Sequence, residues 1–141
     1  MLIAIRAVKG AKNMTRKQLV FLCLKFSDVY EDYPFNKRQS GILWTTIRHK
    51  ENKKIFALIF ERDNQLYINV KCEPQYIEEI RELKKDVFPG FHMNKSHWNT
   101  VRINGDVPKK ELAQMIEHSY RLTLKPKFLM ESNKKRAELF C

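Results

Sequence analysis

The sequence predicts an α+β fold with its elements in the order α-β-β-β-α-β-β-α. Apolar residues recur with a helical period near both ends and in the middle of the chain, and runs rich in β-branched and aromatic residues lie between these segments. Short polar stretches separate the runs, as expected for turns. With 141 residues, the chain is long enough for one domain with a buried core and short for two.

The first helix is expected to run from Thr15 to about Phe26. Thr15 and Gln18, three residues apart, form the signature of a capping box, and apolar residues then follow at positions i, i+3, i+4 and i+7. Cys23 lies on this apolar stripe, so we expect it to be a small core residue and not a nucleophile.

The next segment, Ser27–Arg38, is expected to be a long loop because Pro34 interrupts its aromatic cluster. Three antiparallel strands should follow in a meander, since polar turns separate three strand-like runs. The runs are Ile42–His49, Ile55–Arg62 and Leu66–Lys71. In the third run, a period of two places Leu66, Ile68, Val70 and Cys72 on one face and Tyr67, Asn69 and Lys71 on the other.

A second helix is expected to begin at Pro74, which suits a first helical turn, and to end before Pro89-Gly90. Its apolar stripe is Ile77, Ile80 and Leu83. Oppositely charged residues three positions apart are expected to pair on its exposed side. These pairs are Glu78 with Arg81 and Glu82 with Lys85.

Two short strands, Phe91–Met93 and Trp98–Ile103, are expected next, followed by a turn at Asn104-Gly105. Asp106 is expected to cap a last helix that also carries an apolar stripe. Because all three helices need one sheet face to bury their stripes, we expect a single core. Its predicted members are Leu19, Leu22, Phe26, Ile59, Ile68, Val70, Ile77, Ile80, Leu112 and Ile116.

Composition restricts the classes of function. Lys and Arg number 27 against 16 Asp and Glu, a formal charge of +11 that favours polyanions such as nucleic acid or an anionic membrane surface, although many small basic proteins have no specific partner. No apolar run approaches about 18 residues, so no membrane span is expected. The three cysteines, Cys23, Cys72 and Cys141, show no disulfide or zinc spacing, which favours a reducing, cytoplasmic setting.

Catalytic and metal-binding motifs are not found in the sequence. His92 and His97 are five residues apart across a turn, so together with His118 and Cys72 they lack the tight spacing of a zinc site. Ser96 has no nucleophile motif around it, and the four glycines form no phosphate-binding loop. We therefore expect no metal, no cofactor and no enzymatic activity.

The segment from Phe88 to Ile103 carries far more hydrogen-bonding capacity than a turn requires. Together with cations of the first hairpin and the third strand, it forms a candidate nucleic-acid site in which Trp98 and Tyr67 could stack on bases. The candidates are Arg48, Lys50, Lys53, Lys54, Lys71, Asn94, Lys95, His97, Trp98, Asn99 and Arg102. The sequence leaves a second interpretation open, in which Asn94, His97, Trp98 and Asn99 lock the strands together and the lysines are only solvated.

Four motifs in the same order resemble the MmcQ/YjbR family. They are Tyr30–Phe35, Asn69–Pro74, Gly90–Val101 and His118–Tyr120. The resemblance implies an α+β sandwich with helices packed on an antiparallel sheet, and a DNA-binding protein whose projecting strands and loops meet the duplex. The residues that match as carriers are Lys71, Lys95, His97, Trp98 and Asn99.

The resemblance divides the chain into an N-terminal extension (1–13), a family-like domain (14–124) and a basic C-terminal tail (125–141). For the tail, the sequence leaves two interpretations open, a frayed basic end or a helix docked through Phe128, Leu129, Leu139 and Phe140. The expected function is DNA binding in the cytoplasm, mainly through phosphate contacts with little sequence selectivity, by a monomer or weak homo-oligomer. The alternative is a non-catalytic module whose polar pocket binds a peptide, a partner protein or a small molecule.

Overall fold

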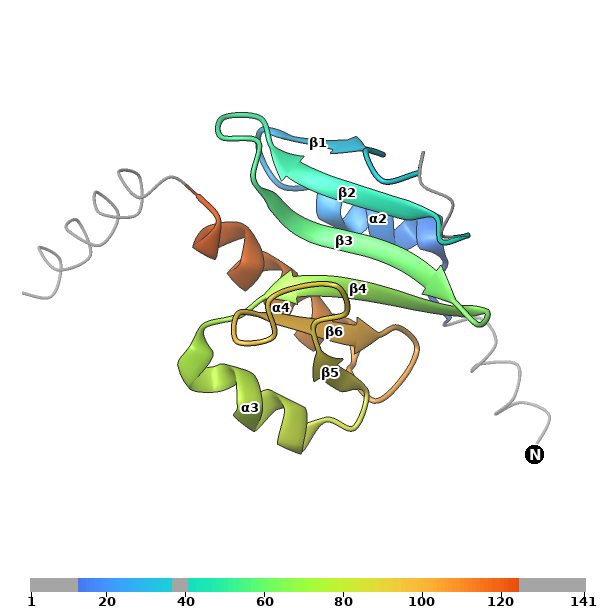
Figure 1. The fold of residues 1–141 in the computed structure, drawn as a ribbon, viewed down its shortest axis with the longest axis vertical. Helices are drawn as coiled ribbons and strands as arrows, with labels where there is room; N and C mark the ends of the chain where they lie inside the picture. The colour runs from blue at the N-terminus through green and yellow to red at the C-terminus, as the bar shows by residue number, and fades with distance from the viewer. Residues whose placement is uncertain (1–12, 37–40, 125–141) are drawn as a thin grey trace, which may run out of the picture.

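The computed structural model describes residues 13–36 and 41–124 of the chain. These residues form three helices and six strands (Figure 1). The helices are α2 (Arg16–Leu24), α3 (Pro74–Leu83) and α4 (Lys109–Leu122). The strands are β1 (Val29–Asp32), β2 (Trp44–His49), β3 (Ile55–Arg62), β4 (Gln65–Lys71), β5 (Val87–Pro89) and β6 (Trp98–Arg102).

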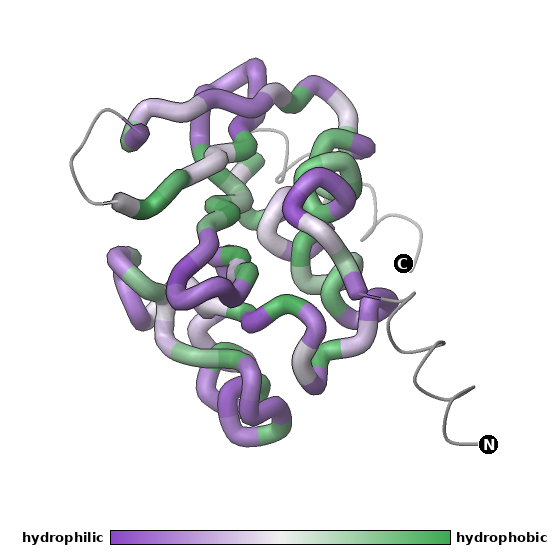
Figure 2. Tube along the Cα trace, turned by 90° about the vertical axis from the view of Figure 1, so that its right-hand side faces the viewer, coloured by the Kyte–Doolittle hydropathy of each residue, from purple (hydrophilic) through white to green (hydrophobic). Residues whose placement is uncertain are grey.

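All six strands belong to one antiparallel sheet with the order β1-β2-β3-β4-β6-β5. Helices α2 and α4 lie behind this sheet in Figure 1, and α3 lies beside β5 and β6. The predicted α+β class, with helices packed on an antiparallel sheet, is confirmed. In the view turned by 90°, Figure 2 shows hydrophilic segments at many of the turns and apolar segments where helices meet strands.

Helix α2 starts as its capping box predicts. The Thr15 hydroxyl accepts a hydrogen bond from the backbone N–H of Gln18 (3.2 Å), and the Gln18 side chain accepts one from the backbone N–H of Thr15 (2.9 Å). The helix ends at Leu24, two residues before the predicted end at Phe26. Cys23 is fully buried, and burial raises the pKa of its thiol to about 12.

Most of the apolar core lies between the sheet and the helices, and we call it the helix-side cluster. Its buried members are Leu19, Cys23, Ile47, Phe56, Ala57, Ile59, Leu66, Ile68, Val70, Val87, Val101, Ile103, Val107, Leu112 and Ile116. Of the ten predicted core residues, six belong to it, and Leu22, Phe26 and Ile80 pack against it. The tenth, Ile77, is buried as well. The prediction of one core shared by three helices is therefore confirmed for nine of the ten residues.

A bulge in β3 adds an aromatic ring to this cluster. Ile47 pairs with Ala57 and Arg48 with Ile55, so Phe56 has no partner on β2. A bulge inserts one extra residue into a strand, so neighbouring side chains no longer alternate regularly between the two faces of the sheet. As a result Phe56 and Ala57 both join the helix-side cluster, and the Phe56 ring lies 5.3 Å from that of Tyr120.

The opposite face of the sheet carries a smaller, mainly aromatic group, which we call the loop-side cluster. Trp44, Leu58 and Phe60 are its buried members. Six partly buried side chains pack against them, namely Phe35, Ile42, Ile55, Tyr67, Phe91 and Met93. Phe91 and Met93 belong to the connection between β5 and β6, residues 90–97, which crosses in front of the sheet in Figure 1. We call this connection the motif loop.

Two strand predictions were wrong. The segment Ser27–Arg38, predicted as a loop, contains β1, in which Tyr30 pairs with Arg48. Pro34 lies beyond the end of β1, so it does not interrupt the strand. The strand predicted at Phe91–Met93 is instead β5, where Val87 pairs with Val101, and Phe91–Met93 forms a turn.

The predicted cap of the last helix was also wrong. Asp106 accepts hydrogen bonds from the backbone N–H groups of Lys85 (2.9 Å) and Asp86 (3.1 Å), so its carboxylate is used by the segment after α3. Helix α4 starts after Pro108 without a side-chain cap. The turn at Asn104-Gly105 is present, with Asn104 at φ +65°.

Candidate nucleic-acid interface

The motif loop has a compact backbone that only a few residue types permit. Gly90 N–H donates to the Trp98 carbonyl (2.9 Å), and a Cβ on Gly90 would lie 2.8 Å from the Trp98 Cβ. His92 adopts φ +60°, and the Asn94 side chain accepts from the backbone N–H of Ser96 (2.9 Å). Asn94 therefore shapes the turn, and half-buried Trp98 packs against Gly90.

Arg81 of α3 holds this loop against the helix through hydrogen bonds. Its Nε donates to Asn99 Oδ1 (2.6 Å), and its Nη2 donates to the carbonyls of Trp98 (3.2 Å) and Lys95. Asn99 is fully buried, and its Nδ2 has no hydrogen-bond partner among the described residues. The predicted pair of Arg81 with Glu78 was wrong, because the guanidinium turns inward to these acceptors.

A second set of hydrogen bonds holds the loop to the sheet. Asn69 is fully buried on β4, donates from Nδ2 to the Phe91 carbonyl (2.9 Å) and accepts from the Thr100 hydroxyl. The same hydroxyl accepts from the backbone N–H of Phe91 (2.8 Å). Phe91 is thereby placed against Phe60, with ring centroids 5.4 Å apart, and the Arg62 guanidinium lies 4.8 Å from the Phe91 centroid.

Several of the predicted contact residues meet at one end of the sheet. The β2–β3 turn (50–54), the end of β4 at Lys71 and the part of the motif loop next to Trp98 all lie there, because β4 pairs with both β3 and β6 in antiparallel register. We call this region the lysine end. It contains Lys50, Lys53, Lys54, Lys71, Lys95 and His97.

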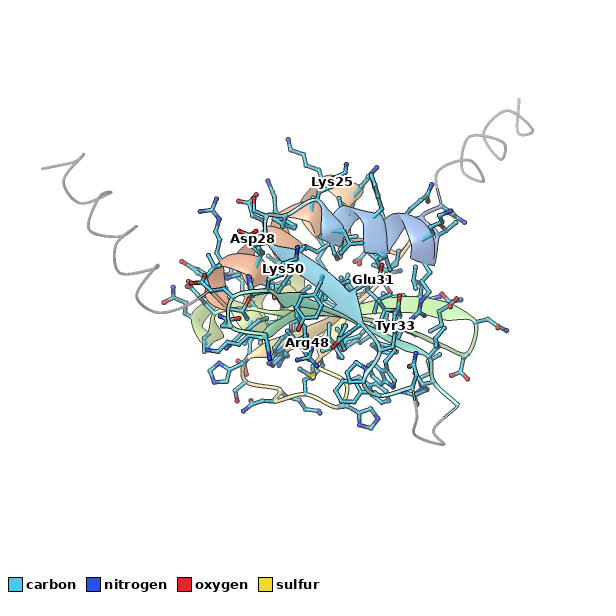
Figure 3. All side chains as sticks on the ribbon, turned by 90° about the horizontal axis from the view of Figure 1, so that it is seen from above. Lys25, Asp28, Glu31, Tyr33, Arg48 and Lys50 are labelled. Carbon is cyan, nitrogen blue, oxygen red and sulfur yellow. The ribbon has the colours of Figure 1, made fainter. Side chains whose placement is uncertain are left out.

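The side chains of the lysine end differ in their exposure and in their hydrogen bonds. Lys50, Lys53, Lys54 and His97 are exposed, and Lys71 is half-buried. Lys95 is exposed, but its ammonium donates to the Gly90 carbonyl (3.1 Å) and so helps to close the motif loop. Two acidic residues are also close. Glu51 lies in the same turn, and a backbone hydrogen bond from the Lys50 N–H to the Asp28 carbonyl (2.8 Å) holds Asp28 beside Lys50 (Figure 3).

Two predicted arginines are placed differently. Arg48 is held by Asp32, with its Nε 3.0 Å and 3.1 Å from the two carboxylate oxygens, and donates from Nη1 to the Lys53 carbonyl (2.9 Å). Arg102 lies at the opposite end of the sheet, where its Nε donates to the Gln65 side chain (3.0 Å). Neither guanidinium therefore adds an unpaired charge to the lysine end.

The two ends of the sheet differ in how their cations are neutralised. At the far end, Arg62 pairs with Asp63 (3.9 Å), Arg102 with Asp86 (4.0 Å) and Lys84 with Glu111 (3.1 Å). Within the described part of the chain, none of the five lysines of the lysine end forms an ion pair with a carboxylate. The lysine end thus gathers five lysines without an ion pair among the described residues.

An apolar groove of about 450 Å³ lies between α3 and α4. Cys72 and His118 line one part of it, and His118 Nε2 accepts from the backbone N–H of Glu73 at 3.4 Å. Burial raises the pKa of the Cys72 thiol, so the thiolate is not the stable form at neutral pH. In residues 13–36 and 41–124, no group of three His, Cys, Asp or Glu side chains could hold a metal ion.

No helix in the described ranges is both long and apolar enough to cross a membrane.

Arg81 is the main structural residue of the motif loop that the sequence reasoning missed. Its place in α3 suggested an exposed surface pair, and no local pattern distinguishes an inward-turning arginine. The available signal was the excess of hydrogen-bonding groups in the motif itself, which required a partner from elsewhere in the fold.

Comparison with known proteins identifies relatives over this same region. The family model described as YjbR matches residues 24–122. YjbR of Escherichia coli K12, named an uncharacterized protein, is 31% identical over 78 residues, which cover 55% of this chain and 66% of the relative. The match thus spans slightly less than two thirds of that relative. YyaQ of Bacillus subtilis, also named uncharacterized, is 30% identical over 102 residues, covering 65% of this chain and 83% of the relative.

Solved structures with the same fold are also found. A crystal structure of a Pseudomonas syringae protein superposes with a TM-score of 0.68 at 30% identity and covers 79% of this chain and all of that one. The Deinococcus radiodurans protein DR2400, described by its domain DUF419, gives a TM-score of 0.68 at 28% identity and covers 86% of each chain.

Proposed function

The chain belongs to the YjbR family, and for this member we propose binding of DNA through phosphate contacts made by the lysine end of its sheet. The supporting observation is that five lysines from three segments meet at the lysine end without a carboxylate partner among the described residues, whereas Arg62, Lys84 and Arg102 at the far end each pair with a carboxylate. Uncompensated surface cations are what a polyanion requires.

The spacing of the lysine end suits a duplex. Neighbouring strands are about 4.8 Å apart, so the front from β2 across β3 and β4 to β6 is about 15 Å wide. Double-stranded DNA carries one negative charge per roughly 1.7 Å of its axis, so such a front faces several phosphates at once. Lys53 and Lys54 in the turn and Lys71 at the end of β4 are the principal proposed contacts, with His97 beside them.

The proposed contacts favour weak sequence selectivity. Base reading usually needs a helix or a two-stranded ribbon whose side chains enter a groove. Here the exposed cations lie on a turn and a loop, and the two candidate amides, Asn94 and Asn99, hold the motif loop together. Binding should therefore depend strongly on salt and little on sequence.

We further propose that the protein acts by binding and not by catalysis, in the cytoplasm, as a monomer or weak homo-oligomer. Cys23 and Cys72, the two cysteines among the described residues, are buried, and burial raises the pKa of both thiols. A nucleophilic thiolate is therefore disfavoured at both positions.

A charge-matched pair of double variants tests the proposal. Lys53→Ala with Lys54→Ala removes two charges from the lysine end, and Lys109→Ala with Lys110→Ala removes two exposed charges from the start of α4, at the far end of the sheet. Fluorescence anisotropy with random-sequence duplex over a salt series gives the affinity. We expect the first variant to flatten the slope of log K against log salt by about two units, at roughly 0.9 per phosphate contact, and the second to leave it unchanged.

Equal changes in both double variants would show that net charge alone attracts DNA, and the lysine end would then have no special role. Absence of salt-dependent binding by the wild-type protein would reject the DNA-binding proposal as a whole. Thermal melts of both variants should match the wild type, because exposed turn lysines contribute little to stability.

A further inference from the structure

The groove between α3 and α4 lies where two helices cover different strands. Helix α4 contacts β3 and β4, whereas α3 contacts β5, so the two helices stand apart over the sheet. Val70 and Cys72 line the floor of the groove, and apolar side chains of both helices line its walls. These wall residues are Tyr76, Ile80 and Leu83 on α3 and Met115 on α4. A volume of about 450 Å³ is in the range of pockets that hold small molecules.

Polar contacts link the two walls at both ends of the groove. At one end, the Lys84 ammonium after α3 pairs with Glu111 of α4 at 3.1 Å. At the other end, His118 Nε2 of α4 accepts a hydrogen bond from the backbone N–H of Glu73, the residue before α3, at 3.4 Å. The walls are therefore held in place by the protein itself, as in a preformed binding pocket.

The two ends of the groove differ in charge. Glu111 neutralises Lys84 at one end. Lys71 lines the other end, next to His118, and forms no ion pair with a carboxylate in residues 13–36 and 41–124. Because His118 Nε2 is an acceptor, the neutral ring carries its proton on Nδ1 and keeps one N–H to donate. The end at His118 therefore offers a positive charge and a donor, which suit an anionic group.

The dimensions and the rim of the groove restrict the rest of the ligand. Along α4 the lining runs from Glu111 to His118, which is about 10 Å of helix. Leu83 is 70% exposed and Tyr76 47%, so two large apolar side chains meet solvent at the rim. A ligand that covers them gains free energy in proportion to the apolar area removed from water. An apolar chain of this length with a negative charge at one end matches both features.

From these observations we propose that the groove between α3 and α4 binds a small carboxylate with an unbranched apolar chain, of the class of medium-chain fatty acids. The chain lies over Val70 and against Leu83, and the carboxylate lies at the end formed by His118 and Lys71. The site does not depend on the proposed binding of DNA, although Lys71 belongs to both surfaces.

An NMR titration of the full chain with octanoate, in the absence of DNA, tests this site. Octylamine is the matched ligand, because it has the same number of carbon atoms and the opposite charge at neutral pH. In proton–nitrogen correlation spectra we expect saturable shifts at Ile80, Met115 and His118. Octanoate should bind about ten times more tightly than octylamine or more, because like charges at the Lys71 end oppose the amine.

Two single variants locate the binding. Leu83→Glu places a negative charge at the rim and should weaken octanoate binding about tenfold or more. Phe21→Glu makes the same change of charge on α2, outside this groove, and should leave octanoate binding unchanged. Leu83 and Phe21 are both exposed apolar side chains, at 70% and 64%, so neither change should disturb the fold. The dispersion of each NMR spectrum checks this.

Several results would overturn the proposal. Shifts that do not saturate, or that spread equally over other surfaces, would show that octanoate has no site in the groove. Equal affinities for octanoate and octylamine would remove the preference for an anion. A wild-type dimer that Leu83→Glu converts to a monomer would assign the groove to a second copy of the chain. A monomer that binds no octanoate would leave the groove to another occupant, such as residues 125–141, which lie outside the described part of the chain.

Discussion

The two faces of the sheet are held by different kinds of interaction. On one face, helices α2 and α4 cover the helix-side cluster, whose fifteen buried residues are all apolar. On the other, only three buried residues form the centre of the loop-side cluster, and part of the cover is the motif loop. Arg81 and Asn69 fix that loop by donating side-chain hydrogen bonds to the carbonyls of Lys95 and Phe91, and the Thr100 hydroxyl accepts one from the backbone N–H of Phe91.

This difference explains the unusual composition of the motif loop. A helix satisfies its own backbone and needs only an apolar stripe to cover a sheet. A loop that covers a sheet leaves backbone groups to be paired, and unpaired buried groups cost about 1–3 kcal/mol each. The amides and the arginine supply those partners. The polar residues that suggested a binding site are therefore in large part the means by which this loop covers the sheet.

The largest expected effect concerns Phe56, the bulge residue of the helix-side cluster. Phe56→Ala should lower the free energy of unfolding by about 3–5 kcal/mol, because a fully buried ring is lost and the rings around it collapse only in part. Phe91→Ala, which removes a half-buried ring from the motif loop, should cost clearly less. Urea denaturation of both variants measures the difference. Equal losses would mean that the loop-side cluster is as important to stability as the helix-side cluster.

A smaller effect is expected for Arg81. Arg81→Ala should lower the free energy of unfolding by roughly 2–3 kcal/mol, because Asn99 and the Trp98 carbonyl lose a charged donor. Hydrogen exchange should increase in the motif loop and stay unchanged in α2 and α4.

Two further variants provide the controls for Arg81. Arg81→Lys should not restore stability, since an ammonium cannot reproduce the forked geometry that reaches three acceptors. Arg121→Ala removes an exposed arginine that pairs with Glu117 and should cost less than about 0.5 kcal/mol. A loss that spreads over all helices in Arg81→Ala would contradict a local role.

The smallest expected effect is a pH dependence on the helix side. His49 is buried, its Nε2 lies 2.7 Å from the Thr123 hydroxyl, and burial lowers its pKa from 6.5. The neutral ring is thus favoured in the folded state, and its contribution to stability is complete above pH 6.5 and is lost as the pH falls through the folded-state pKa.

Urea midpoints measured on both sides of pH 6.5 can test this. The midpoint should fall on acidification, and it should fall less in His49→Gln, which has no ionisable group at this position. An identical fall in both proteins would assign the pH dependence to other groups.

Some features of the fold could be predicted because they depend on neighbours in the sequence. The capping box needs only Thr15 and Gln18, and the buried face of β4 follows from strict alternation between Leu66 and Cys72. The burial of Cys23 follows from its place on a helical stripe. For the candidate site, the structural roles of Asn94, Asn99 and Lys95 in the motif loop were not predictable from the sequence.

The sequence by itself determined the α+β class, most of the element order and the core face of each helix, because these depend on periodicity within about ten residues. Only the tertiary structure decided that β5 is Val87–Pro89, that Asp106 serves the backbone of Lys85 and Asp86, and that Arg81 binds Asn99. It also decided that lysines from three separate segments meet at one end of the sheet. The physical reason is that each of these results depends on a partner more than ten residues away, and local preference cannot choose among several possible partners at that distance.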